Sequence, residues 1–189
     1  MKDVISRKIE IVVGLGNPGD AYKYTYHNLG FLALEYLALK IKKETGFDLK
    51  FKTSKSKKFS HAKACGIIFL KPLTFMNEVG QAVKTALKFF KIPKEKMLVI
   101  HDESDLNLGD YRFSFNRGSA GHRGVESIIK EIGSKSFVRL RIGVRHKESK
   151  SIRMPALRFI LKKISPLDRK ILYSVLGAAM EKLAVNEKP

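Results

Sequence analysis

A run of β-branched residues, Ile11-Val12-Val13, breaks off into a loop that holds three glycines and a proline within residues 14–19. Such a run is typical of a buried strand, and the glycines together with Pro18 exclude a regular element directly after it. Polar and aromatic side chains continue to position 28, where a helical pattern begins. Because a rigid strand aims the loop that follows it, this loop is a candidate site to which other segments bring polar groups.

The rest of the chain alternates short apolar runs with longer segments of helical periodicity. Strands are predicted at 64–70, 97–100, 111–115 and 137–144, and helices at 29–43, 77–92, 124–132 and 165–183. We therefore expect a single domain, residues 1–189, with a three-layer α/β/α fold around a twisted, mixed and mostly parallel sheet. Functional groups should gather at the carboxyl ends of the strands, where Asn17, the loop 71–77 and Asp102 each follow a predicted strand.

The charge balance indicates a polyanionic partner. The chain carries 37 Lys and Arg against 18 Asp and Glu, a formal net charge of +19. Nucleic acid is the leading candidate, and a solvated basic surface is the alternative. The single cysteine, Cys65, excludes an internal disulfide and suits a reducing compartment. Without a signal peptide or an apolar stretch of the ~20 residues that a membrane-spanning helix needs, we expect a soluble cytoplasmic protein.

Lysines and aromatic residues intermingle over residues 47–63, where Phe51 and Phe59 lie among six lysines. The pattern predicts a strand or hairpin with an exposed basic loop. It fits contact with nucleic acid, and it fits equally well a charged sheet edge surrounded by solvent. The sequence leaves both interpretations open.

The spacing Gly14-x-Gly16-x-x-Gly19 matches the dinucleotide-binding fingerprint. That fingerprint needs a helix directly after its third glycine, to receive the pyrophosphate, and then a strand that ends in an acidic residue. Here Pro18 and the polar segment 20–27 delay the helix, and no strand ends near position 40. A nucleotide-dependent dehydrogenase is therefore disfavoured.

The glycine-rich segment Gly118–Gly124 leads into a predicted helix. It lacks the G-x-S-x-G elbow of serine hydrolases. It suits an anion instead, since backbone N–H groups at a helix start face outward and Arg117 and Arg123 would add charge. His61 and Cys65, although four residues apart, lack the further ligands that a metal site needs, and no metal is expected.

His27 is the strongest catalytic candidate, because an imidazole exchanges protons near neutral pH. Asp102, at a predicted strand end, is placed to orient an imidazole, while Asn17 and Asn77 offer amides for a substrate carbonyl. Each residue also has a purely structural interpretation: a lone histidine is often a core residue, Asn17 precedes a proline in a turn, and Asn77 suits a helix cap.

Taken in order along nearly the whole chain, seven motifs resemble the bacterial peptidyl-tRNA hydrolase family. They are VGLGNPG (13–19), Tyr22, HNLG (27–30), KPLTFMN (71–77), HDESDL (101–106), GHRG (121–124) and RLRIGV (139–144). Several spaced motifs in the right order are far more specific than any single one.

The resemblance implies hydrolysis of the ester that joins a peptide to the terminal ribose of tRNA. It implies that His27 is the general base that activates water and that Asp102 orients His27. It further implies a monomer that needs neither cofactor nor metal, with peptidyl-tRNA as its partner and no membrane. The residues implied in substrate binding are Asn17, Tyr22, Met76, Asn77 and Arg123, and those expected at the tRNA are Arg112, Arg117, Arg141 and Lys150.

The chain departs from the family pattern at four places. Tyr26 stands where the family usually has arginine, Arg123 replaces an asparagine, Ser114 replaces a basic residue that grips a tRNA phosphate, and Arg145-His146-Lys147 replaces a glycine-rich turn. Arginine can only donate hydrogen bonds, whereas an asparagine amide donates and accepts. The rival hypothesis is therefore an RNA-binding homologue with impaired catalysis, as in organelle splicing factors of this family.

Overall fold

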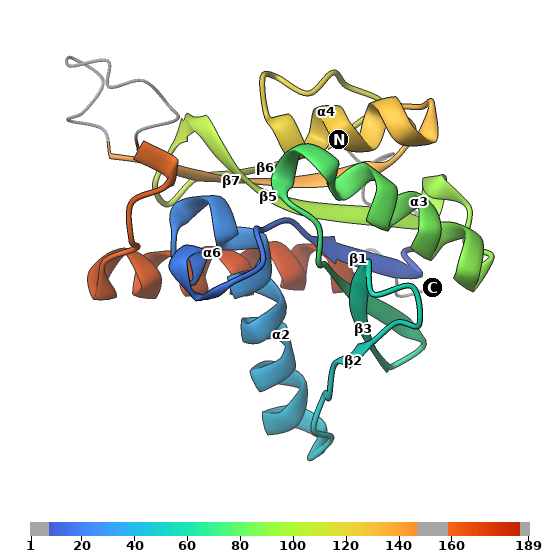
Figure 1. Cartoon of the computed structure of the whole chain (residues 1–189). Coiled ribbons are helices and arrows are strands. Elements are labelled where there is room, and N and C mark those ends of the chain that lie inside the picture. Colours follow the sequence, from blue (N-terminus) through green and yellow to red (C-terminus); the bar gives the residue numbers. More distant parts are fainter. Residues whose placement is uncertain (1–7, 147–158, 186–189) are drawn as a thin grey trace.

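The computed structural model describes residues 8–146 and 159–185, and these form a seven-stranded sheet with helices on both faces (Figure 1). The strand order is β2-β3-β4-β1-β5-β7-β6. The strands are β1 Ile11–Gly14, β2 Lys52–Thr53, β3 Phe59–Ala64, β4 Ile67–Pro72, β5 Met97–Asn107, β6 Tyr111–Phe115 and β7 Val138–Arg145. The α-helices are α2 Leu29–Thr45, α3 Val79–Phe90, α4 Arg123–Ile132 and α6 Pro166–Val185.

The sheet is parallel at its centre and antiparallel at its edges. Strands β4, β1, β5 and β7 run parallel, whereas β2 and β3 on one side and β6 on the other are antiparallel to their neighbours. The predicted α/β fold with a mixed sheet is confirmed. The basic segment 47–63 forms the hairpin of β2 and β3 at one edge, as its pattern predicted.

Alternating residues of each central strand pack into two separate cores. In β1, Val12 faces the core that includes α2 and α6, whereas Ile11 and Val13 face the core of α3 and α4. The period of two along a strand produces this division, and it explains why the central strands are apolar on both faces. None of the described helices combines the length and the apolar character that would be needed to cross a membrane.

Strand β5 extends further than its sequence indicated. The apolar run was expected to end at Ile100, but pairing with β7 continues through His101 and Asp102 to Glu103. These three polar residues are buried. Asp102 therefore lies within the strand rather than after it, and the reason is that buried polar groups can remain in a strand when other side chains satisfy them.

Close backbone contact fixes the start of α2 against the sheet. A Cβ atom on Gly30 would lie 2.1 Å from the backbone nitrogen of Leu15 and 2.5 Å from the carbonyl oxygen of Ile100. A Cβ atom on Gly14 would lie 2.2 Å from the carbonyl oxygen of Gly30. Only glycine permits this approach, which sets the turn carrying His27 directly over the end of β1 and the middle of β5.

We expect Gly30→Ala to destabilise the fold by about 3 kcal/mol, because the added methyl group meets backbone atoms that cannot rotate away. Gly118→Ala is the matched control, since a Cβ atom there meets nothing within 4 Å. Urea unfolding of both variants measures the difference. Equal stabilities would contradict the contact described for Gly30.

Candidate active site

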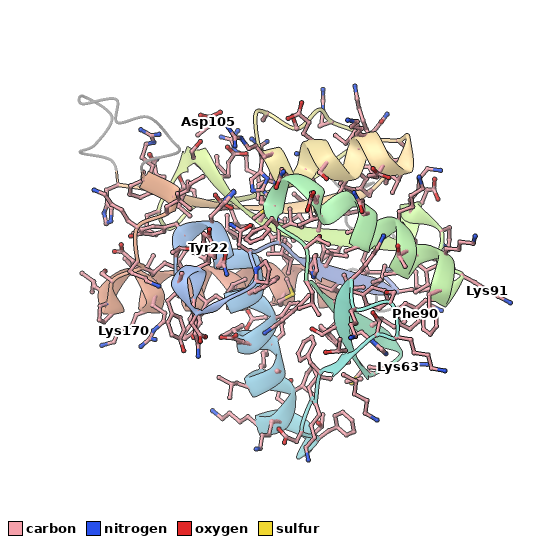
Figure 2. The ribbon with its side chains drawn as sticks, viewed as in Figure 1. Tyr22, Lys63, Phe90, Lys91, Asp105 and Lys170 are labelled. Atoms are coloured by element: carbon pink, nitrogen blue, oxygen red, sulfur yellow. The ribbon has the colours of Figure 1, made fainter. Side chains whose placement is uncertain are left out.

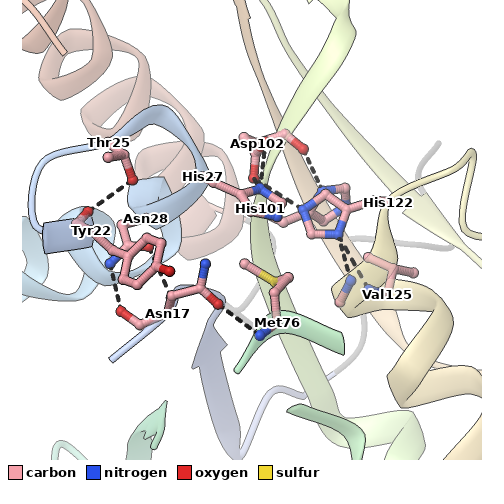
Figure 3. A network of polar contacts seen from close by, with 11 residues as sticks. Asn17, Tyr22, Thr25, His27, Asn28, Met76, His101, Asp102, His122 and Val125 are labelled. Carbon is pink, nitrogen blue, oxygen red and sulfur yellow. Dashed lines mark hydrogen bonds and ion pairs between the residues drawn. The ribbon is translucent and has the colours of Figure 1, made fainter. Parts of the chain in front are cut away.

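A short 3₁₀ helix, η2 (Tyr26–Asn28), brings His27 against Asp102 of β5 (Figure 3). Nδ1 of His27 lies 3.1 Å from each carboxylate oxygen of Asp102. Both side chains are almost fully buried, with exposed fractions of 7% for His27 and 3% for Asp102. An ionised carboxylate only accepts hydrogen bonds, so Nδ1 of His27 donates the proton of this bond and Nε2 is left as the nitrogen that can act as a base.

A second imidazole, that of His122, shares the same carboxylate. Its Nε2 lies 3.0 Å from Oδ1 of Asp102. Its Nδ1 accepts the backbone N–H groups of Gly124 and Val125, at 3.1 and 3.3 Å, and so caps α4. A nitrogen that accepts two N–H groups bears no proton, which makes Nε2 the protonated nitrogen that donates to Asp102. The start of α4 therefore fixes the tautomer of His122.

These contacts govern protonation in the site. Burial by itself raises the pKa of Asp102, but His122 and His27 outweigh it and hold that pKa well below its usual range. His101, fully buried beside them, donates from Nδ1 to the carbonyl oxygen of Asp102 at 2.7 Å. Burial lowers the pKa of His101 well below its ordinary value, and the neighbouring His122 lowers it further. The site is thus an ionised carboxylate that contacts the imidazoles of His27 and His122, beside the buried ring of His101.

Asn17 is held by hydrogen bonds on three sides. Its Oδ1 accepts the N–H of Met76 at 2.7 Å. The side-chain amide of Asn28 binds both the backbone N–H and the carbonyl of Asn17, each at 2.9 Å. Since Oδ1 accepts from Met76, Nδ2 of Asn17 is left as a donor. Within the described chain it donates no hydrogen bond. Figure 3 shows this nitrogen directed away from the loop, toward the side of His27.

Two adjoining cavities open over these groups, and both are lined by His27, Arg123 and Ile160. One, of about 370 Å³, extends over Asp102 and His122. The other, of about 230 Å³, is lined by the predicted substrate-binding residues. These are Asn17, Tyr22, Met76, Asn77 and Arg123. The structure thus brings the residues predicted from the sequence together around one cavity, and their roles stay predictions.

Arg123 and Asn77 are the exposed members of this group, and Tyr22 packs edge-to-face against Phe75 with ring centroids 6.2 Å apart. Asn77 does not cap α3 as its sequence suggested. It lies inside the short 3₁₀ helix η3 (Met76–Glu78), and Glu78 occupies the cap position without a side-chain hydrogen bond. The side chain of Asn77 is therefore not committed to a capping bond.

The expected tRNA-contacting arginines lie at the opposite side of the sheet from β2. Arg112 of β6 and Arg141 of β7 are paired in register, and Arg112 is exposed. Arg141 is bound to the buried Glu103, with Nη2 2.8 Å from Oε2. Arg117 is exposed on the glycine-rich loop, and Lys150 lies outside the described residues. Their contact with tRNA stays a prediction.

Three residues that position the site were missed. His122 was not singled out, because histidine is a rare helix cap and its contact with Asp102 spans separate elements. Asn28, at the start of the predicted helix, was given no part in the site, yet its amide holds Asn17. Arg139 is buried and binds the carbonyl oxygen of Gly118 at 2.8 Å, and burial lowers its pKa to about 10. The sequence signal that could have identified His122 as a cap was its position just before the start of the predicted helix.

The anion site expected at the start of α4 is wrong. The N–H groups of Gly124 and Val125, which would have bound the anion, are taken by Nδ1 of His122. The helix start instead orients an imidazole. The positive end of the dipole of α4 faces Nδ1 of His122 and so favours the lone pair on that nitrogen.

His27, Asp102 and His122 also have the composition of a metal site, with one ligand atom of each within 4.8 Å of the others. A ligating imidazole nitrogen must present its lone pair. The nitrogen of His122 that faces Asp102 is the protonated one, because its other nitrogen caps α4. The hydrogen bonds therefore favour a proton-transfer group, and the expectation that no metal takes part stays a prediction.

Residues 11–187 match the family model described as peptidyl-tRNA hydrolase. This chain belongs to that family. The peptidyl-tRNA hydrolase of Aquifex aeolicus is 38% identical over 177 residues, which cover 91% of this chain and 86% of the relative. That of Thermus thermophilus is 46% identical over 134 residues, 71% of this chain and 67% of the relative. A crystal structure of the Acinetobacter baumannii peptidyl-tRNA hydrolase matches with a TM-score of 0.78 and 31% identity, covering 94% of this chain and 87% of that one.

The resemblance to the peptidyl-tRNA hydrolase family and the assignment as an ester hydrolase, both made from the sequence, are confirmed by these comparisons. Of the four departures from the family pattern, Ser114 has a buried hydroxyl with no partner among the described residues. Arg145 donates from Nε to the carbonyl oxygen of Ser104 at 3.0 Å. Arg123 lines both cavities.

The fourth departure, Tyr26, ties the turn that carries His27 to helix α6. The hydroxyl of Tyr26 donates to Oδ2 of the buried Asp168 in α6, and its ring stacks on Phe159 at 4.7 Å. His146 contacts the same carboxylate oxygen at 3.1 Å. Although burial raises the pKa of Asp168, the bonds from Tyr26 and His146 lower it overall.

We expect Tyr26→Phe to destabilise the fold by about 2 kcal/mol at pH 7, the usual range for a hydrogen bond to a charged group. The pKa of Asp168 is lowered in the folded state, so its contribution is present above the unfolded pKa of about 3.9 and fades as the pH falls below it. Denaturant unfolding at pH 7 and at a series of pH values from 4 down to about 2 measures this loss.

Tyr173→Phe serves as the control, because the structure gives its hydroxyl no hydrogen bond within the described chain, although its ring stacks on Tyr36 at 5.2 Å. Equal effects of the two substitutions would contradict the role given to Asp168.

Proposed function

We propose that this chain cleaves the ester bond between a peptide and the terminal ribose of tRNA, with His27 as the general base that activates water. The observation that carries the proposal is the buried pair of His27 and Asp102 at the floor of the larger cavity, with Nε2 of His27 as a free base. An ester needs no metal or cofactor for hydrolysis when a water molecule and a base are held in position.

In the proposed reaction, Nε2 of His27 takes a proton from water as the water oxygen attacks the ester carbonyl carbon. The resulting imidazolium donates to Asp102, whose carboxylate balances the charge. When the bond from carbon to the ribose oxygen breaks, His27 returns the proton to that oxygen. The products are a free peptide acid and a tRNA with a free hydroxyl group.

Asn17 is proposed to bind the carbonyl oxygen on which negative charge develops. Its Nδ2 is the donor left over after Oδ1 accepts from Met76, so the amide is locked with the donor side available. A donor that is fixed before the reaction stabilises the transition state without reorganising. Tyr22, Met76 and Asn77 would line the path of the peptide.

Peptidyl-tRNA as substrate also accounts for the net charge of +19, since phosphates attract basic surfaces. Arg112, Arg117 and Arg141 are proposed at the tRNA end nearest the ester, as is Lys150. To bind a phosphate, the guanidinium of Arg141 would have to contact Glu103 and the phosphate together, or break its ion pair with Glu103. We further propose that the protein acts in the cytoplasm and as a monomer.

His27→Ala should reduce kcat on an N-acetylated aminoacyl-tRNA by a factor of roughly 10³ while leaving tRNA affinity within twofold, since the base is lost but not the basic surface. Asp102→Asn should cost roughly 10², because an amide has no negative charge to balance the imidazolium that forms on His27. Single-turnover hydrolysis and a tRNA-binding titration measure the two quantities. Normal turnover by His27→Ala would show that the mechanism is wrong.

The second candidate function is an RNA-binding homologue with impaired catalysis. The observation in its favour is Arg123, a donor-only side chain that lines both cavities at the position of a family asparagine. If the protein is an active enzyme, we expect robust hydrolysis by the wild type and by the Arg123→Asn variant. A binding module predicts tight tRNA binding without wild-type hydrolysis, and recovery of hydrolysis in Arg123→Asn would identify the residue responsible.

A further inference from the structure

Positive charge is concentrated in one quarter of the chain. Residues 49–94 contain eleven lysines, no arginine and a single acidic residue, Glu78, and so contribute +10 of the net charge of +19. This segment comprises β2, β3, β4 and α3. The strands of this segment form the edge of the sheet opposite to β6, where Arg112 lies. The two basic surfaces are therefore separate.

The exposed lysines of this edge form what we call the lysine face. It consists of Lys52, Lys55, Lys57, Lys63, Lys88 and Lys91, all exposed. The ion pairs of the described chain include none of the six. Charges left without partners remain available to an external anion, whereas lysines elsewhere on the same segment, such as Lys71 with Glu35 and Lys84 with Glu131, are paired.

Strand register and helix packing place these lysines together. Phe59, His61 and Lys63 alternate along β3 and so share one face of the sheet, and Lys52 pairs with His61 in register. The rings of His61 and Phe90 are 5.1 Å apart, which sets the end of α3 on that face. Figure 2 shows Lys63, Phe90 and Lys91 in the same part of the molecule, away from Tyr22.

An exposed aromatic ring lies among these cations. Phe89 is 65% exposed, and its ring packs against Phe90 at 4.8 Å. Cations interleaved with an accessible aromatic ring are the combination by which proteins hold nucleic acid without reading its sequence.

The lysine face begins beside the catalytic cavity and leads away from it. The N–H of Leu73 donates to the carbonyl oxygen of Lys58 at 2.8 Å, so the tip of the β2–β3 hairpin touches the loop that carries Met76 into the cavity. From there α3 extends over twelve residues, or about 18 Å, to Lys88 and Lys91. The face is thus remote from the ester but continuous with the site.

We propose that the lysine face is a second RNA-contact surface, which binds the phosphate backbone of the tRNA body at a distance from the ester-bearing end. The inference rests on the proposed function. In a tRNA a base-paired stem follows the short unpaired 3′ end, so a substrate whose end occupies the cavity carries a dense row of phosphates beyond it. Lys88 and Lys91 contact these phosphates without touching the reacting atoms.

The test compares Lys88→Gln/Lys91→Gln with the control Lys43→Gln/Lys170→Gln, which removes the same charge from exposed lysines of α2 and α6. KM and kcat are measured against salt for an N-acetylated aminoacyl-tRNA and for the same acyl group on a CCA trinucleotide. We expect KM for the tRNA to rise roughly tenfold near 0.1 M salt, with kcat unchanged, and the slope of log KM against log salt to fall by roughly 0.7–0.9 per lysine.

The trinucleotide substrate should be unaffected in both variants, since it does not reach the lysine face. If the two double variants behave alike on the tRNA, the proposal is overturned. Titration with deacylated tRNA separates this result from failure of the proposed function. Weaker binding in the Lys88/Lys91 variant alone supports the second contact surface even if the wild type hydrolyses nothing, and equal binding overturns it.

Discussion

The carboxylate of Asp102 is the group on which the arrangement of the site depends. It accepts hydrogen bonds from His27 and His122, and so joins the turn before α2, the middle of β5 and the start of α4. A buried carboxylate without partners would strongly disfavour folding. Here the two imidazoles keep it ionised, and in return it fixes which nitrogen of each ring carries the proton. One charge thus links stability to the orientation of the proposed base.

Two backbone features make that arrangement geometrically possible. Gly14 and Gly30 allow α2 to begin in contact with the strand ends, which brings His27 within reach of Asp102. The amide of Asn28 then pins the loop of Asn17 from the other side. Tyr26, whose hydroxyl binds Asp168, fastens the same turn to α6. The proposed catalytic groups His27 and Asp102 are buried, whereas exposed cations such as Lys52 and Arg112 lie at the two edges of the sheet.

The sequence by itself determined the order of strands and helices, because β-branched runs, helical periodicity and glycine stops are local signals. It predicted the helix at 29–43, which the structure extends to Thr45 before a left-handed Gly46 with φ of 73°. It also selected His27, Asp102, Asn17 and Asn77, through spaced motifs that resemble a known family. The lysine-rich segment was recognised as well, although its surroundings were left open.

Only the tertiary structure decided how far β5 extends, since Asp102 and Glu103 remain in the strand because distant side chains satisfy them. It alone gave His122 a role, for its two partners lie on α4 and β5 and no local pattern links them. It placed Lys63, the lysine of β3, in the same part of the molecule as the end of α3, through sheet register and ring packing. Each of these facts depends on contacts between residues remote in sequence, which periodicity and composition do not encode.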